Sequence, residues 1–199
     1  MGEPGIETRL MEPGSINIPV GTFPKTDIVK EEDAQLVARR VVEKFNHALE
    51  NQDIAAVVSM FYEDGFWRDH LALSWDLHTL KGHDAIYSLL QQECRIKRME
   101  VDNSSAFRAP LLQDMGSVTV IQFFHTFSTA FGTGRGVARL VPINSEWKIW
   151  TMFTSLQELN GFEQTIGNRR PDGHEQLVDH KNWQDVRHEE IAFESQDPV

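Results

Sequence analysis

Two ionisable side chains stand in stretches whose neighbours predict β-strands. Asp69 lies near the end of residues 66–70, and His125 shares strand parity with Phe123 and Phe127. Because side chains alternate across a strand, that imidazole faces either a pocket or a buried partner. A carboxyl buried among apolar groups has a raised pKa, which suits a general base. We expect Asp69 and His125 to form an acid and base pair across a cavity. A satisfied core histidine and a purely structural Asp69, bonded to backbone or to Arg68, are the alternatives.

Three further candidates follow residues 71–74, a loop that we expect to cover the mouth of that cavity. Trp75 would line the pocket beside His78, and Asp76 would supply a second carboxylate for epoxide hydrolysis or proton shuttling. The same alternation fits an edge strand with one solvated face, so both interpretations stay open. Arg139 would bind a carboxylate or phenolate, unless it is an exposed strand arginine.

Other chemistries find no support in the spacing. The chain has 8 histidines but no HxH or HExxH pattern, so we expect no metal. No G-x-S-x-G occurs, and Cys94 has apolar neighbours on a predicted helix. Residues 132–136 carry alternate glycines but lack the third glycine and the following helix of a dinucleotide fingerprint. We therefore expect no FAD, NADP or other cofactor.

Composition restricts the partners. Among 199 residues, 19 Lys and Arg face 30 Asp and Glu, which gives a net charge of −11. Nucleic acid and anionic membranes are disfavoured, because both are bound by clustered cations. No apolar run is long enough for a transmembrane span, and the first residues lack a signal-peptide pattern. A single cysteine fits a reducing compartment, so we expect a cytoplasmic protein.

The order of elements predicts an α+β domain, because helices come first and an antiparallel meander follows. Glycine and proline mark residues 1–29 as an arm, residues 30–157 form the domain, and residues 158–199 form a tail that packs on it. Both faces of the last strands are apolar, with Ile149 and Phe153 expected opposite Trp150 and Met152. The outer face then needs a second subunit or the tail, and we expect a homodimer. The expected helices are 33–51, 54–61 and 84–95, and the expected strands are 66–70, 74–80, 97–107, 116–128, 130–142 and 146–156.

A family resemblance rests on residues 45–53, on Trp67-Arg68-Asp69 and on residues 80–86. This pattern resembles the SnoaL-like branch of the nuclear transport factor 2 superfamily over residues 30–157. The resemblance implies a cone in which three helices lie in the concave side of a strongly curved mixed sheet. The mouth of such a cone encloses a small-molecule pocket.

A closer resemblance, on residues 66–77, 147–154, 169–171 and 182–187, is to the N-terminal domain of fungal flavin-containing monooxygenases. In those proteins the flavin-binding domain begins just after the position where this chain stops. The chain is then either a freestanding relative or a fragment, and its Met1 start and complete cone favour the former. Freestanding fungal relatives act as cyclases, isomerases or epoxide hydrolases on polyketides and terpenoids.

The resemblance extends to ketosteroid isomerase, where the position of Asp69 holds the general base. That family places an oxyanion-binding tyrosine on the first helix, and this chain has Phe45 there, which argues against steroid isomerisation. We expect the substrate to contact Phe45, Trp67, Trp75, His78, Phe123, Arg139 and Trp150.

Two functions follow. The leading hypothesis is a cofactor-independent enzyme of fungal secondary metabolism that uses Asp69, with His125 or Asp76, on a small apolar metabolite. Its reaction would be that of a cyclase, isomerase, epoxide hydrolase or dehydratase. The alternative is a non-catalytic binding or assembly module, like the accessory domain of a flavin monooxygenase.

Overall fold

The computed structural model describes residues 22–27, 32–92, 95–170 and 182–192, without the side chains of Val186 and Glu190. The chain divides into two compact units, Met1–Glu163 and Gln164–Val199. The first holds three helices and seven strands, and the second holds the short 3-10 helix η2 (Gly167–Arg169) and α4 (Trp183–Ala192). The proposed packing of the tail on the domain stays a prediction.

The first two helices of the first unit begin at aspartates that cap them. The Asp33 carboxylate accepts from the Gln35 amide at 2.9 Å, and the Asp53 carboxylate accepts from the Ala56 amide at 2.9 Å. Each bond satisfies an amide that has no partner inside its helix. The three helices are α1 (Ala34–Glu50), α2 (Ile54–Ser59) and α3 (Gly82–Gln92).

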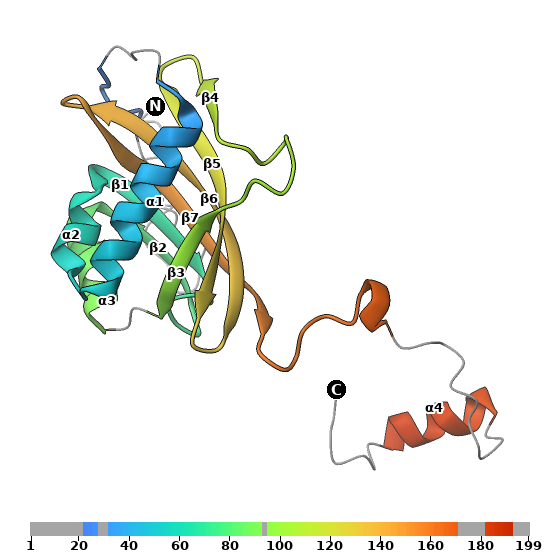
Figure 1. Cartoon of the computed structure of the whole chain (residues 1–199). Helices are drawn as coiled ribbons and strands as arrows, with labels where there is room; N and C mark the ends of the chain where they lie inside the picture. The colour runs from blue at the N-terminus through green and yellow to red at the C-terminus, as the bar shows by residue number, and fades with distance from the viewer. Residues whose placement is uncertain (1–21, 28–31, 93–94, 171–181, 193–199) are drawn as a thin grey trace, which may run out of the picture. The chain divides into compact units, whose positions relative to one another are not determined.

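The seven strands form one curved sheet in the order β2-β1-β7-β6-β5-β3, and β4 also pairs with β5 (Figure 1). Strands β1 and β7 run parallel, whereas the other pairs are antiparallel. The predicted α+β cone is confirmed, because this sheet curves around the three helices (Figure 1). The strands are β1 (Phe61–His70), β2 (Leu77–Lys81), β3 (Ile96–Val101), β4 (Leu111–Asp114), β5 (Thr119–Thr129), β6 (Gly132–Ile143) and β7 (Glu146–Leu159).

The main core lies between the helices and the concave face of the sheet. Phe45 of α1 meets Trp67 of β1 edge-on, with ring centroids 6.0 Å apart, and Phe61 stacks on Trp67 at 5.5 Å. All three are buried, together with Phe123 and Leu140. Burial of this aromatic set is the main force that holds the sheet around the helices.

The outer face of the sheet carries a second apolar cluster, which includes Val120, Val141 and Trp150. Part of the arm, residues 22–27, covers it: the Phe23 ring lies 5.7 Å from that of Trp150, and the Asp27 amide donates to the Pro142 carbonyl at 3.0 Å. The sequence suggested a second subunit or the C-terminal tail for this face. Residues 22–27 of the arm lie on this face, and the second subunit or the tail stays a prediction for the rest of it.

No helix among the described residues is long and apolar enough to cross a membrane.

Candidate functional site

Asp69 is fully buried on the concave face of β1, two residues beyond Trp67. One carboxylate oxygen, Oδ2, accepts from the amides of Ala72 at 3.1 Å and Leu73 at 2.9 Å. The other, Oδ1, accepts a hydrogen bond from the Thr154 hydroxyl. Burial raises the pKa of Asp69, and these hydrogen bonds oppose the rise less strongly. The carboxyl therefore takes up a proton more readily than an exposed aspartate.

Thr154 of β7 connects that carboxyl to the aromatic core. Its side-chain oxygen accepts from Trp67 Nε1 at 2.9 Å while its hydroxyl donates to Asp69. Thr154 is fully buried, so neither bond competes with solvent. This arrangement fixes the direction in which the threonine proton points.

His125 lies on the same face of β5, between Phe123 and Phe127, and is fully buried. Neither ring nitrogen has a hydrogen-bond partner of acceptable geometry. Burial lowers the pKa of His125 from 6.5 to about 4, and the nearby Phe153 carbonyl opposes this less strongly. At neutral pH the imidazole is therefore uncharged, with one N–H and one free lone pair.

Glycine makes the room for this ring. His125 is paired across the strands with Gly136, and a Cβ at Gly136 would lie 2.5 Å from its Nε2 and 1.9 Å from the Phe153 carbonyl oxygen. Gly134 serves Phe127 in the same way, with a Cβ only 2.1 Å from the ring. The alternate glycines of residues 132–136 are thus sites where aromatic rings lie across the backbone of β6.

Asp69 and His125 belong to one row across four neighbouring strands. The register pairs Asp69 with Thr154, Thr154 with Gly136, and Gly136 with His125. We call these four residues the concave-face row. The sheet curves around the helices (Figure 1), and both Asp69 and His125 are fully buried on its concave side. The structure thus places the predicted acid and base pair in one row.

The loop after β1 covers that interior. Ala72 and Leu73 are buried, and Leu71 adopts a left-handed conformation with φ of 65° that carries strain in a residue with a Cβ. On the outside, the Trp75 ring lies 5.9 Å from that of Phe131. The loop is therefore attached from within by Asp69 and from outside by an aromatic contact.

Two of the remaining candidates, Trp75 and Asp76, lie outside that interior. Trp75 is 57% exposed, and the exposed Asp76 accepts from the Leu77 amide at 2.7 Å. His78 pairs with Asp69 across β1 and β2, so it lies on the same face of the sheet, and its charge opposes the rise in the pKa of Asp69. Its Nε2 is 2.6 Å from the Ser74 hydroxyl. The expected strand 74–80 starts only at Leu77, because the preceding residues form the loop.

Arg139 and Trp150 face the other side of the sheet. Arg139 alternates with the core residues Ala138 and Leu140, and Trp150 packs in the second apolar cluster. A substrate in the cone would not reach them. Of the residues expected at the substrate, Phe45, Trp67 and Phe123 line the interior.

Thr154 and Gly136 were missed by sequence reasoning. A threonine in a β-rich run has no distinguishing signal, because β-branched residues are common in strands. The alternate glycines of residues 132–136 were visible in the sequence. Their role could be recognised only from the strand register, which places His125 and Phe127 opposite Gly136 and Gly134.

The described residues hold no group of three or more His, Cys, Asp and Glu side chains placed to bind a metal. Cys94 and the tail histidines His174 and His180 lie outside the described residues.

Cavities of about 880, 470 and 510 Å³ open elsewhere on the described part of the first unit. None of the three is lined by Asp69 or His125. Asp69 and His125 are both fully buried, so the concave-face row and these open grooves are separate features.

No family model matches the chain, and no curated protein matches it. Solved structures resemble it weakly. A cystatin-like fold protein from Burkholderia xenovorans has 16% identity and a TM-score of 0.46, covering 63% of this chain and 93% of its own. ActVI-ORFA from Streptomyces coelicolor has 14% identity and a TM-score of 0.44, and the match covers 61% of this chain and 95% of that protein. An NTF2-like protein of unknown function from Pseudomonas putida has 14% identity and a TM-score of 0.43, and the match covers 61% of this chain and 85% of that protein. Likeness at this level carries no argument about activity.

Proposed function

We propose that the chain is a cofactor-independent enzyme that performs general acid and base catalysis on a small apolar molecule inside the cone. The observation that carries the proposal is the fully buried imidazole of His125 in the same row as Asp69, whose nearby Phe153 carbonyl does not meet it in good hydrogen-bond geometry. A buried polar group without a partner costs free energy, so it calls for an explanation beyond packing. A ligand that hydrogen-bonds to His125 supplies one.

The two side chains suit different roles. Asp69 would accept a proton from substrate carbon or hydroxyl, because burial raises the pKa of its carboxyl toward a useful range. The neutral His125 would donate its N–H to the oxygen on which negative charge develops, as an uncharged imidazole with a lowered pKa can do. It would thereby take the role of the oxyanion-binding tyrosine hydroxyl, which Phe45 at the corresponding position does not have.

Access to this interior requires the loop at residues 71–74 to move. Ala72 and Leu73 donate to the same oxygen of Asp69, so lifting the loop also frees that oxygen. Substrate binding would then exchange two loop hydrogen bonds for contacts to the reacting molecule. The strained Leu71 is a suitable hinge, since opening relieves its left-handed conformation.

The reaction class we propose is that of a cyclase, isomerase, dehydratase or epoxide hydrolase, since each needs only an acid and a base. The proposed setting, fungal secondary metabolism of polyketides or terpenoids in the cytoplasm by a homodimer, rests on the sequence resemblance. The apolar aromatic interior around Trp67 supports a substrate of that character.

The second candidate is a non-catalytic ligand-binding or assembly module, like the accessory domain of a flavin monooxygenase. The observation that favours it is the hydrogen bonding of Asp69, whose oxygens already hold the loop and Thr154. In this alternative Asp69 is a structural residue that closes the cone.

The experiment that separates the two is a cofactor-free screen. Purified protein is incubated with small-molecule extract from its source organism, and products are compared by liquid chromatography and mass spectrometry with those of Asp69→Asn. The enzyme proposal predicts a compound that is rearranged at constant mass, or that gains or loses water, only with wild type. Retention of an unchanged compound by both proteins would instead support the binding module.

A further inference from the structure

A groove of about 880 Å³ lies between α1, α2 and the beginning of β7, away from the concave-face row. Its lining includes the buried α1 residues Val37, Val41 and Ala48, with Met60 and Trp147 across from them. These five side chains give the groove an apolar floor. Its volume falls in the range of sites that bind small molecules.

Two cations border this floor on α1. At about 100° per residue, Lys44 lies about 20° and Arg40 about 60° from Val37 around the helix axis, whereas Glu43 lies about 120° away. The positive side chains are therefore nearer the floor than the acid on the same helix. Neither Arg40 nor Lys44 makes an ion pair or direct hydrogen bond with another described residue, although the charge of Lys44 acts on the exposed Glu146 carboxylate, which also lines the groove.

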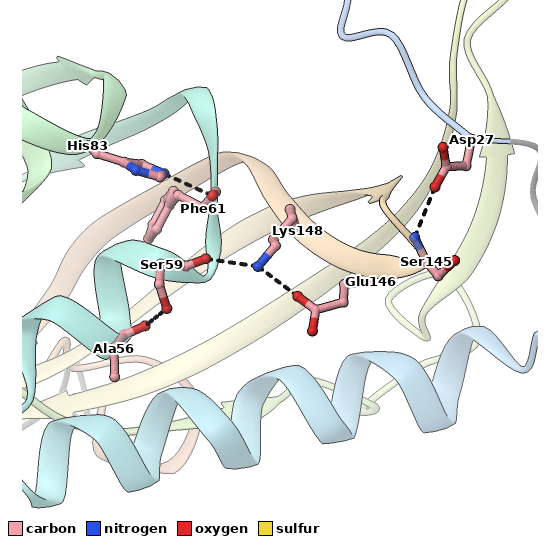
Figure 2. Close-up of polar contacts among 8 residues, drawn as sticks. All are labelled: Asp27, Ala56, Ser59, Phe61, His83, Ser145, Glu146 and Lys148. Carbon is pink, nitrogen blue, oxygen red and sulfur yellow. Dashed lines mark hydrogen bonds and ion pairs between the residues drawn. The ribbon is translucent and has the colours of Figure 1, made fainter.

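The charges on the opposite wall are already engaged. Figure 2 shows Lys148 of β7 between two partners: its Nζ donates to the Ser59 carbonyl at 3.1 Å and meets the Glu146 carboxylate at 2.8 Å. Asp53 also lines the groove, but its carboxylate caps α2. The other acids on the lining are Glu32, just before α1, and the outer Glu43.

The Lys148 contact also divides this groove from its neighbour. A second cavity, of about 470 Å³, lies on the other side of Ser59 and Lys148, which line both. His83 borders that second cavity and lies 3.0 Å from the Phe61 carbonyl (Figure 2). The bond from Lys148 to Ser59 therefore lies at the boundary between the two cavities.

We propose that this groove binds an anionic amphiphile, a medium-chain carboxylate whose head group meets Arg40 and Lys44. Its hydrocarbon chain lies on the floor formed by Val37, Val41, Ala48, Met60 and Trp147. The head group carries a single negative charge, because Glu32 and Glu43 repel a second. The overall charge of −11 makes these two cations decisive, since the rest of the protein repels an anion.

The test is calorimetric titration of the full chain with decanoate below its micelle concentration, beside decanamide as the neutral probe. Decanoate binds more tightly than decanamide. Arg40→Gln and Lys44→Gln each weaken decanoate binding about threefold to fivefold, as expected for partly exposed charge pairs, and leave decanamide unaffected. Glu43→Gln strengthens decanoate binding about twofold, because it removes a nearby negative charge.

Arg39→Gln is the matched control, since Arg39 is exposed on the same helix but does not line the groove. It leaves decanoate binding unchanged. Met60→Gln weakens both probes equally, because it makes the floor polar. The proposal is overturned if folded protein binds no decanoate, if decanoate and decanamide bind equally, or if Arg39→Gln weakens binding as much as Arg40→Gln.

Discussion

Replacing His125 by leucine removes the one buried imidazole of the concave-face row at nearly constant volume. In the folded protein its pKa is about 4, against an ordinary value of 6.5. Because the folded state resists protonation, the stability due to this group is fully present above pH 6.5 and is lost as pH falls toward 4. The unfolded chain takes up the proton first.

The magnitude follows from the two pKa values. A lowering from 6.5 to about 4 corresponds to about 3 kcal/mol of unfolding free energy lost between pH 7 and pH 4. At pH 4.5 the expected loss is about 2–3 kcal/mol by the same relation. At pH 7 the leucine variant is as stable as wild type or slightly more stable, because a buried polar group without a partner is replaced by an apolar one.

The assay is urea unfolding of both proteins at pH 7 and pH 4.5, followed by circular dichroism. Other titrating groups affect both proteins alike, so the difference between them isolates His125. We expect the unfolding free energy of His125→Leu to rise by about 2–3 kcal/mol relative to that of wild type between pH 7 and pH 4.5. An unchanged difference between the two pH values would refute a buried, neutral and unpartnered His125.

Three further substitutions test the packing around this row. Gly136→Ala should destabilise the fold by about 1–3 kcal/mol in urea unfolding, since its Cβ would lie 1.9 Å from the Phe153 carbonyl oxygen. A variant as stable as wild type would contradict the close approach of β7 to Gly136. Thr154→Val should cost about 2–4 kcal/mol, because it removes partners from both Asp69 and the core indole, and a thermal melt equal to wild type would contradict those bonds. Asp53→Ala should lower the unfolding free energy by about 1 kcal/mol, because it removes the N-cap of α2. An unchanged unfolding free energy would show that this hydrogen bond does not stabilise the fold.

Much of the fold could be predicted from the sequence because local pattern and tertiary burial agree. The apolar residues that recur with a 3.6-residue period in α1 form the face that packs on the core. Asp53 caps α2, as its position just before Ile54 predicts. The last three strands form the expected meander. Short β4, whose four residues are all exposed, has no alternation to detect, and α4 has no apolar stripe.

One parity prediction on β7 was wrong. The sequence placed Phe153 with Ile149 on one face and Met152 with Trp150 on the other. A register shift between β6 and β7 changes the alternation, so Met152 is buried with the core. Phe153 meets His70 instead, with ring centroids 5.0 Å apart. A bulge of this kind depends on the partner strand, which periodicity along one strand does not contain.

The candidate site was predictable as residue types on strands, but its geometry was not. An acid and an imidazole on apolar strands indicated Asp69 and His125, and the register then placed them in one row. Asp76 and Trp75 were expected at the pocket because they follow a covering loop. The structure places them outside, since the loop turns its buried residues Ala72 and Leu73 inward.

The most direct test of the acid and base proposal is the turnover number of Asp69→Asn on the compound that the cofactor-free screen identifies, with circular dichroism to confirm folding. Because general acid and base groups contribute about 10²- to 10⁴-fold, we expect kcat to fall at least about a hundredfold. A folded Asp69→Asn variant with the kcat of wild type would contradict the assignment of Asp69 as the base and leave the cone as a binding module.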